Sequence, residues 1–323
     1  MEFVENTCTN PHYNMAFDEA LLKRPPTDHP VFCLWQNRPS VIIGLNQSAY
    51  AEVNLPYLDR HGISLARRVT GGGAVYHDLG NVNYSIAAQA RCLDEAACLQ
   101  QVVDALRSLG IPAGRSGRND ILVEGRKCSG YAKRMDRDRI LIHGTLMFRV
   151  NLHSLTRALA VPGSKLSAAG IASVRSRVAN LQEYLPPQTT VQSFRKALQE
   201  RLAGTNGEIP LSPEWLSAVQ ARADEKFSTW QWNFGHSPAA SFQVRQKFPC
   251  GTVEARFSLR HGCLDDICFG GDFLGNLPAG ELAGRLRGVP FRLPDLAQAL
   301  EDAQNYFDGL QGTELAQFLI QVQ

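Results

Sequence analysis

The residues of this chain best suited to chemistry lie in one glycine-rich stretch, residues 67–81. Arg67 and Arg68 precede three consecutive glycines at 71–73, and a Tyr-His-Asp sequence follows at 76–78. Glycines let a turn adopt positive φ and let a ligand come close to the backbone. The N–H groups exposed in such a turn form a nest for anionic oxygens, and guanidinium groups match a phosphate or a carboxylate. The stretch therefore predicts an anion-holding turn beside a short apolar slot, although a plain hairpin turn is the alternative.

Several familiar motifs are absent around this stretch. No Gly-Lys-Ser/Thr follows the glycines, so it is not a P-loop, and no G-x-G-x-x-G opens a helix as in a dinucleotide-binding fold. The chain also lacks the G-x-S-x-G elbow of serine hydrolases. The chemistry is therefore expected to depend on holding an anion rather than on a nucleophilic serine.

Lys127 is the candidate for the chemical step. It follows a predicted hairpin turn, and the small pair Ser129 and Gly130 beside it would let a ligand approach. An ammonium group fixed near a reacting carboxylate and phosphate stabilises charge that grows in the transition state. Cys128 should point to the opposite face of the strand and belong to the core. It remains the covalent alternative, because a neighbouring cation can lower the pKa of a thiol.

Other candidates lie in turns and loops. Asn119 and Asp120 precede a predicted strand, where they can form a structural turn or reach a ligand, and Asp120 can help to hold Mg²⁺. Residues 170–180 are small, hydroxylated and basic, which suits phosphate or ribose contacts or a solvated loop. His143 interrupts an apolar strand, where a lone histidine is more often structural than catalytic. Residues 115–139 hold eight basic and four acidic side chains, and this excess can steer an acidic partner.

Length and composition limit the class of protein. The chain has 323 residues, is 44% hydrophobic and 20% charged, and has a net charge of +2, which does not by itself indicate a nucleic-acid binder. We expect one large domain and a smaller one. The sequence shows no secretory signal and no apolar run long enough to span a membrane. The eight cysteines form no C-x-x-C pair, which favours a reducing compartment and a cytoplasmic enzyme.

The hydrophobic patterns predict alternating helices and strands up to residue 238, then a module of grouped strands and helices. Helices are expected over residues 14–23, 53–60, 99–109, 152–159, 191–202, 213–224, 279–286 and 294–307. Strands are expected over residues 31–35, 41–44, 64–68, 83–88, 121–123, 127–131, 139–150, 241–248, 252–259 and 263–269. Residues 165–180 read as a long loop. The predicted domains are residues 1–238 and residues 239–323.

Taken in order, these motifs resemble the lipoate–protein ligase family over nearly the whole chain. The series runs Arg-Arg-x-x-Gly-Gly-Gly-Ala-Val-Tyr-His-Asp-x-Gly-Asn, Gly-Arg-Asn-Asp, Lys-x-Ser-Gly, His-Gly-Thr-Leu, Ser-Val-Arg-Ser-Arg-Val and Trp-x-Trp-Asn-Phe-Gly. The resemblance implies an α/β (α+β) fold: a large mixed-sheet domain of the biotin/lipoate ligase, class II synthetase-like type, with a small C-terminal α+β domain.

The resemblance also implies an activity. The family activates lipoate with ATP and Mg²⁺ to lipoyl-AMP and then transfers the lipoyl group to a carrier lysine. The implied partners are the lipoyl domains of 2-oxoacid dehydrogenase acyltransferase subunits and the glycine-cleavage carrier protein, with no nucleic acid and no membrane, and the enzyme is expected to be a monomer.

By the same resemblance, Lys127 is catalytic and contacts both the acyl carbonyl and the phosphate. The ATP or adenylate site is implied to comprise Arg68, Gly73, Ala74, Val75, Tyr76, Asn119, Asp120, Lys127, Ser173 and Arg175. The lipoate site is implied to comprise Gly71, Gly72, Gly73, His77, Lys127, Ser129, Gly130, His143 and Gly144. No metal ligand is assigned beyond Asp120 through Mg-ATP.

Three alternatives remain open from the sequence. One is an octanoyl- or lipoyl-transferase of the same fold that acts through Cys128 without ATP. Another is a transferase that accepts only preformed lipoyl-AMP. The third is a non-catalytic protein that binds lipoate or its adenylate.

Overall fold

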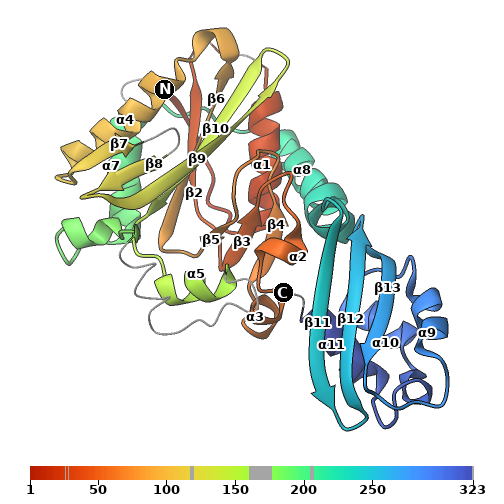
Figure 1. Ribbon diagram of the computed structural model, residues 1–323. Helices are drawn as coiled ribbons and strands as arrows, with labels where there is room; N and C mark the ends of the chain where they lie inside the picture. Colours follow the sequence, from red (N-terminus) through yellow and green to blue (C-terminus); the bar gives the residue numbers. More distant parts are fainter. Residues whose placement is uncertain (26, 28, 117–119, 160–176, 204–206, 322–323) are drawn as a thin grey trace. The chain divides into compact units, whose positions relative to one another are not determined.

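The computed structural model describes residues 1–25, 27, 29–116, 120–159, 177–203 and 207–321. Contacts within the chain divide these residues into two compact units (Figure 1). The first unit contains residues 1–45, 62–159 and 177–228, and the second contains residues 46–61 and 229–321. In the described part of the chain, no helix has the length and apolar character needed to cross a membrane.

The first unit is built on a seven-stranded mixed sheet, which confirms the predicted fold class. Its strands, in spatial order, are β1 (Glu2–Glu5), β2 (Val31–Trp35), β6 (Asn81–Gln89), β10 (Arg139–Met147), β9 (Arg126–Asp136), β8 (Asp120–Val123) and β7 (Ala113–Ser116). β1 and β2 are parallel, whereas the other neighbouring pairs are antiparallel.

The two faces of this sheet carry different elements (Figure 1). Helices α4 (Glu95–Ser108) and α7 (Val191–Ala203) contribute apolar side chains to the hydrophobic core on one face. Helix α1 (Pro11–Lys23) contacts β6 and β10, and also β4 of a second, three-stranded sheet. That small sheet has the order β4 (Ser64–Arg67), β3 (Ser40–Ile43) and β5 (Val75–His77), and α5 (Leu152–Ala158) contacts β5.

Strand periodicity separates apolar from polar side chains in the large sheet. Successive side chains of a strand point to opposite faces, and the core on the α4/α7 side includes Val82, Tyr84 and Ile86 of β6. The intervening Ser85 lies opposite His143 of β10 in the antiparallel register, and both side chains are buried. The sheet therefore has a buried polar row on the side that faces away from its main hydrophobic core.

The second unit has an antiparallel sheet of β11 (Ala240–Phe248), β12 (Gly251–Arg260) and β13 (Cys263–Gly271). Its core also includes side chains from α9 (Ala279–Leu286), α10 (Leu293–Ala299) and α11 (Gly312–Ile320). The short helices α2 (Ala49–Glu52) and α3 (Leu55–Arg60) belong to this unit as well. Buried Tyr50 anchors α2, since its one hydroxyl proton is shared between the carbonyl groups of Gly262 and Phe291, each at 3.4 Å.

Most predicted elements are present, and the differences have local causes. The first helix begins at Pro11 because Asn10 caps it, whereas Asn14 is buried and its amide donates to the carbonyl groups of Cys8 and Gln36. The helix predicted over 53–60 is present as α3, which begins two residues later at Leu55 after the Asn54 cap, and α2 precedes it as an unpredicted helix. The helix predicted over 294–307 ends at Ala299, and the loop predicted over 165–180 lies mostly outside the described residues. Helix α8 (Pro213–Arg222) packs against α1.

Candidate functional site

A cavity of about 290 Å³ lies in the first unit, among α1, the large sheet and the small sheet. Its volume is at the lower end of small-molecule sites, which span about 300–1,000 Å³. The described residues that line it are Met15, Trp35, Ile42, Arg68, Gly72, Gly73, Ala74, Val75, His77, Asn83, Asp120, Lys127, Gly130, Tyr131, Ala132, His143, Gly144 and Thr145. The glycine turn and the candidate lysine therefore share one cavity.

The buried guanidinium of Arg68 donates hydrogen bonds to the carbonyl groups of the glycine turn. Its Nη2 donates to the carbonyl groups of Gly71 at 2.7 Å and Gly73 at 2.8 Å. Its Nη1 donates to the carbonyl of Ile42 in β3 at 3.1 Å, and its Nε donates to the Thr70 hydroxyl at 3.0 Å. Burial lowers the pKa of Arg68 to about 10, so the group remains a cation at neutral pH. Most of its donors are therefore engaged by the protein itself.

The turn presents its amide groups away from Arg68. In a trans peptide the carbonyl and the N–H point in opposite directions, so fixing the carbonyls of Gly71 and Gly73 turns the N–H groups of Gly72 and Ala74 outward. Within the part of the chain that the structure describes, the amides of residues 71–74 donate no hydrogen bond. Gly72 has φ +94°, which favours glycine at this position. This arrangement is an anion nest.

Lys127 reaches the same cavity from strand β9. Its Nζ forms an ion pair with Asp120 Oδ1 at 2.7 Å, and both side chains are partly exposed. A Cβ atom on Gly130 would lie 3.1 Å from the Lys127 Cε and Nζ atoms, so the glycine makes room for the ammonium group. A register shift in the β8–β9 pairing, in which Ile121 lies opposite Ser129 and Leu122 opposite Lys127, leaves Cys128 as an extra residue.

This bulge explains why Lys127 and its neighbours face different environments. Cys128 is fully buried, and its thiol donates to the carbonyl of Ile121 at 3.3 Å. Burial raises the pKa of Cys128 to about 12, which keeps the thiol protonated. Ser129 is also buried and does not line the cavity. The prediction that Cys128 is a core residue agrees with this environment, whereas a thiolate nucleophile does not.

The opposite part of the cavity wall is mainly apolar, with Met15, Trp35, Ile42 and Val75. His77 and Asn83, which pairs with Trp35, are polar members of the wall, and His77 Nδ1 lies 3.1 Å from the side-chain amide nitrogen of Asn37. Burial, with contributions from the Arg68 charge and from His143, lowers the pKa of His77 to about 3. His77 is therefore neutral at physiological pH, and this part of the cavity suits an uncharged, largely apolar group.

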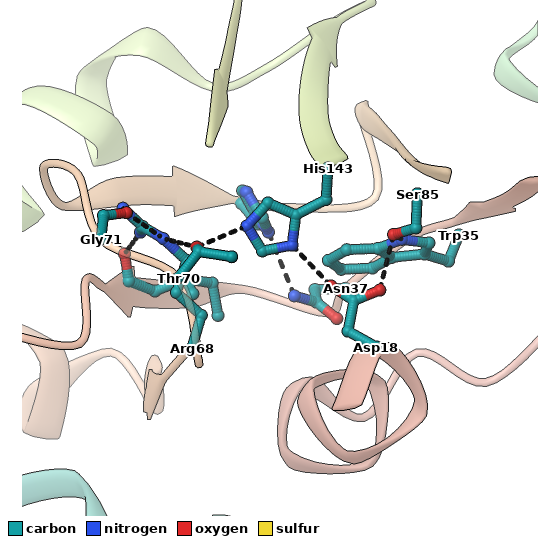
Figure 2. Close-up of polar contacts among 10 residues, drawn as sticks. Asp18, Trp35, Asn37, Arg68, Thr70, Gly71, Ser85 and His143 are labelled. Carbon is teal, nitrogen blue, oxygen red and sulfur yellow. Dashed lines mark hydrogen bonds and ion pairs between the residues drawn. The ribbon is translucent and has the colours of Figure 1, made fainter. Parts of the chain in front are cut away.

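A chain of polar contacts lies behind the cavity wall (Figure 2). It runs from Trp35 Nε1 to Ser85 Oγ at 2.8 Å, and from Ser85 Oγ to Asp18 Oδ1 at 2.6 Å. It continues from Asp18 Oδ2 to His143 Nδ1 at 2.6 Å, and from His143 Nε2 to Thr70 Oγ1 at 2.7 Å. His143 thus lies between a carboxylate of α1 and a hydroxyl of the glycine turn.

The candidate residues are placed as follows. The structure brings Arg68, Gly72, Gly73, Ala74, Val75, His77, Asp120, Lys127, Gly130, His143 and Gly144 to the cavity wall. Gly71, Tyr76 and Ser129 do not line it, although the Gly71 peptide is part of the turn. Asn119, Ser173 and Arg175 lie outside the described residues.

Sequence reasoning missed seven described residues of the cavity wall, namely Met15, Trp35, Ile42, Asn83, Tyr131, Ala132 and Thr145. It also missed Asp18, which contacts His143. Met15 and Asp18 belong to a helix that reads as ordinary core, and most of the others lie on buried strands. Thr145 belongs to the His-Gly-Thr-Leu motif and could have been identified from it, whereas the others lie outside the motifs and are brought together by the pairing of the strands.

Comparisons with known proteins cover both units. Residues 10–203 match the model of the lipoyl protein ligase A/B catalytic domain, and residues 237–319 match that of the bacterial lipoate protein ligase C-terminus. The chain is 35% identical to lipoate–protein ligase 1 of Staphylococcus aureus over 331 residues, which cover 99% of this chain and 100% of the relative.

Solved structures of related proteins are also similar. A bi-partite lipoate protein ligase from Thermoplasma acidophilum, described together with its E2 lipoyl domain, has a TM-score of 0.66 at 32% identity and covers 73% of this chain and 96% of that chain. Lipoate-protein ligase A bound with ATP has a TM-score of 0.62 at 30% identity, with 73% and 98% covered. Protein Ta0514 from T. acidophilum with bound lipoic acid has a TM-score of 0.61 at 29% identity, with 72% and 98% covered.

Proposed function

The chain belongs to the lipoate–protein ligase family, and from this membership we propose that the cavity between the glycine turn and Lys127 is where its chemistry takes place. The protein is an ATP-dependent ligase that attaches lipoate to lipoyl domains. The single observation that supports the proposed site is the convergence of an anion nest, a lysine and an apolar wall on one cavity.

The reaction has two steps, and each has a defined bond exchange. In the first, a lipoate carboxylate oxygen attacks the α-phosphorus of ATP, the bond to the bridging oxygen breaks, and pyrophosphate leaves. In the second, the amine of a carrier lysine attacks the acyl carbonyl, the bond from the carbonyl carbon to the phosphate oxygen breaks, and AMP leaves. The amine loses a proton during this step. Activation is necessary because a carboxylate is a poor acylating agent, and the enzyme must hold the anhydride and exclude water.

We assign the phosphate to the amides of the glycine turn. Four consecutive N–H groups are available there, and the buried Arg68 cation lies directly behind them. Donors that are fixed before the reaction stabilise phosphate charge without reorganising. The apolar wall formed by Met15, Trp35, Ile42 and Val75 would receive the lipoyl tail.

We assign the acyl–phosphate junction to Lys127. Its ammonium group lies at the cavity wall and is ion-paired with Asp120. When the carboxylate and phosphate oxygens arrive, they can replace Asp120 as partners of the ammonium group, which then stabilises negative charge in both steps. Lys127 is therefore the catalytic residue of this proposal.

Mg²⁺ fits this site only together with ATP. Among the described residues, no group of three His, Cys, Asp or Glu side chains could hold a metal ion. Mg²⁺ is commonly bound by one or two carboxylates with substrate phosphates, and Asp120 supplies one carboxylate at the cavity wall. Bound there, the ion would neutralise phosphate charge.

The proposal extends to the carrier domains, the assembly state and the location of the enzyme. We expect the acceptors to include the lipoyl domains of 2-oxoacid dehydrogenase acyltransferase subunits and the glycine-cleavage carrier protein, and we expect the enzyme to act as a monomer. All eight cysteines are unpaired, which supports the reducing environment of the cytoplasm. For the chain's division, we propose a catalytic domain of residues 1–238 and an accessory domain of residues 239–323.

One experiment tests the proposed function directly. The purified protein is incubated with ATP, Mg²⁺, lipoate and an apo lipoyl domain, and the mass of the domain and the release of pyrophosphate are measured. We expect both a lipoylated domain and pyrophosphate. Pyrophosphate release without a mass change of the lipoyl domain would contradict transfer. If the domain gains mass when lipoyl-AMP is supplied but not when ATP and lipoate are supplied, the protein is the transferase that accepts preformed lipoyl-AMP.

A matched pair of variants tests the role of Lys127. Lys127→Ala should abolish both pyrophosphate release and transfer while the thermal unfolding transition is retained. Lys196→Ala, a change of an exposed lysine in α7, is the control and should leave both steps unchanged. Normal transfer by Lys127→Ala would remove Lys127 from the proposal without affecting the family assignment.

A further inference from the structure

We infer that Asp18 is a positioning residue for the anion nest, and that it acts through His143 and Thr70. Asp18 does not line the cavity, and none of the sequence motifs contains it. The inference rests on the proposed function, since it concerns how the glycine turn is held for the adenylate. The three residues and Arg68 are called the Asp18–Arg68 chain below.

A continuous series of short polar contacts connects these residues. Asp18 Oδ2 lies 2.6 Å from His143 Nδ1, and His143 Nε2 lies 2.7 Å from Thr70 Oγ1. Arg68 Nε then lies 3.0 Å from the same Thr70 oxygen. Figure 2 shows the imidazole of His143 between the carboxylate and the hydroxyl. All four side chains are buried, so water does not compete for these contacts.

The donors and acceptors assign a single direction to the chain. A guanidinium only donates and a carboxylate only accepts. The Asp18 carboxylate accepts the His143 Nδ1–H, so in the neutral imidazole Nε2 accepts the Thr70 hydroxyl proton while the Thr70 oxygen accepts from Arg68 Nε. Every donor in this arrangement has an acceptor, and hydrogen bonds aligned in one direction strengthen one another.

Asp18 also receives a donor from its other side. Ser85 donates its hydroxyl proton to Asp18 Oδ1 at 2.6 Å, while the Trp35 indole N–H donates to Ser85 at 2.8 Å. Trp35 and His143 both line the cavity. The Asp18 carboxylate therefore accepts from two branches of hydrogen bonds. One branch leads through Ser85 to Trp35, and the other leads through His143 to the glycine turn.

The consequence for the reaction follows from Arg68. Its Nη2 holds the carbonyls of Gly71 and Gly73, and this orientation turns the amides of the nest outward. The Asp18–Arg68 chain fixes Arg68 through Nε, so that Nη2 is held in register with the turn. Without the chain, the turn loses a fixed support, and binding of the phosphate must include the cost of ordering it.

The test measures two isosteric changes and one rescue. Thr70→Val removes the hydroxyl with little change of volume, Asp18→Asn replaces one of the two acceptor oxygens that Ser85 and His143 contact by a donor, and Thr70→Ser keeps the hydroxyl. ATP–pyrophosphate exchange with lipoate is measured in the full-length protein as a function of ATP concentration. We expect Thr70→Val and Asp18→Asn each to lower kcat/KM for ATP by about 10–100-fold, largely through KM, and Thr70→Ser to remain within about threefold of the parent.

The double variant separates positioning from general stability. If the two residues act as one chain, Asp18→Asn with Thr70→Val should be no more than about threefold worse than the poorer single variant. Thr156→Val removes a buried hydroxyl bonded to a helix carbonyl in α5, and this control should exchange pyrophosphate at the parent rate.

Several outcomes would overturn the inference. They are parental kinetics in Asp18→Asn, effects that multiply in the double variant, or failure of Thr70→Ser to restore exchange. If Asp18→Asn does not fold, the comparison of Thr70→Val with Thr70→Ser is the test. Loss of exchange in both variants would show that the Thr70 hydroxyl does not support the nest, and the inference would fail. If the unmodified protein does not exchange pyrophosphate with lipoate, the proposed function fails instead.

Discussion

The substitution Gly44→Ala tests whether the position of the glycine turn controls the reaction. Gly44 follows β3 and packs directly against the turn. A Cβ atom at this position would lie 2.1 Å from the carbonyl oxygen of Gly72, 3.1 Å from its carbonyl carbon and 3.2 Å from Arg68 Nη2. The change adds one methyl group and introduces no charge, so its effect arises from the displacement of the turn.

The structure sets the size of that displacement. Real Cβ atoms essentially never come closer than 3.0 Å to another atom, so the Gly72 oxygen must recede by about 1 Å. Because the oxygen belongs to the backbone, the amides of the nest move with it. A displacement of about 1 Å in a binding group can cost about 10²-fold in rate. The added methyl group should also lower the free energy of unfolding by about 1–3 kcal/mol through strain.

The assay is ATP–pyrophosphate exchange in the presence of lipoate, combined with thermal unfolding. We expect Gly44→Ala to lower kcat/KM for ATP by about 10²-fold while the protein stays folded. Gly114→Ala in β7 is the control, because no atom lies within 4 Å of its added Cβ and its φ is not in the left-handed region. Parental kinetics in a folded Gly44→Ala variant would refute the assignment of the nest to the phosphate.

Two further predictions concern single side chains. Cys128→Ala should retain transfer within about threefold and lower the free energy of unfolding by about 1 kcal/mol, because the buried thiol contacts the Ile121 carbonyl; loss of transfer with intact adenylation would favour covalent catalysis. Burial would raise the pKa of Glu19, but hydrogen bonds from Arg222 and Lys226 hold it at about 2. This stabilisation is present above the unfolded pKa near 4.5 and disappears as pH falls towards 2. Glu19→Gln should therefore remove up to about 3 kcal/mol at pH 7 and flatten the dependence of unfolding on pH between 5 and 2; an unchanged slope in acid titrations would contradict this.

The elements that could be predicted are those whose hydrophobic pattern is complete within one continuous segment. Residues 31–35 and 279–286 match β2 and α9, because an apolar run or a helical stripe is complete within each segment. The short strands β1, β5 and β7 were missed, whereas β3 and β8 were predicted, because β3 and β8 each contain three consecutive apolar residues and the missed strands contain at most two. Helix α11 was also missed, although its buried face carries Leu315 and Leu319.

The candidate site could also be predicted only where its residues lie in one compact motif. The glycine turn and Lys127 could be identified because each is a compact motif, and both line the cavity. Asp18 could not be identified, since its importance comes from β10 placing His143 within 2.6 Å of α1. The pairing of Ser85 with His143 is a property of strand register, which sequence periodicity leaves undetermined.

Arg68 shows how the correct residue can be predicted with an incomplete role. The resemblance implied a direct contact of Arg68 with ATP, yet its donors contact Thr70 and the carbonyls of Ile42, Gly71 and Gly73. In the proposed site the cation would still act on the phosphate, because a charge buried behind the turn is weakly screened. It polarises the same peptides whose amides face outward. Lysine could not replace it, since one ammonium lacks the planar fork that holds these carbonyls together. The proposed anion site therefore depends on a buried positive charge that would reach the phosphate mainly through backbone peptides, so a change in Arg68 and a change in the glycine turn should impair the same step.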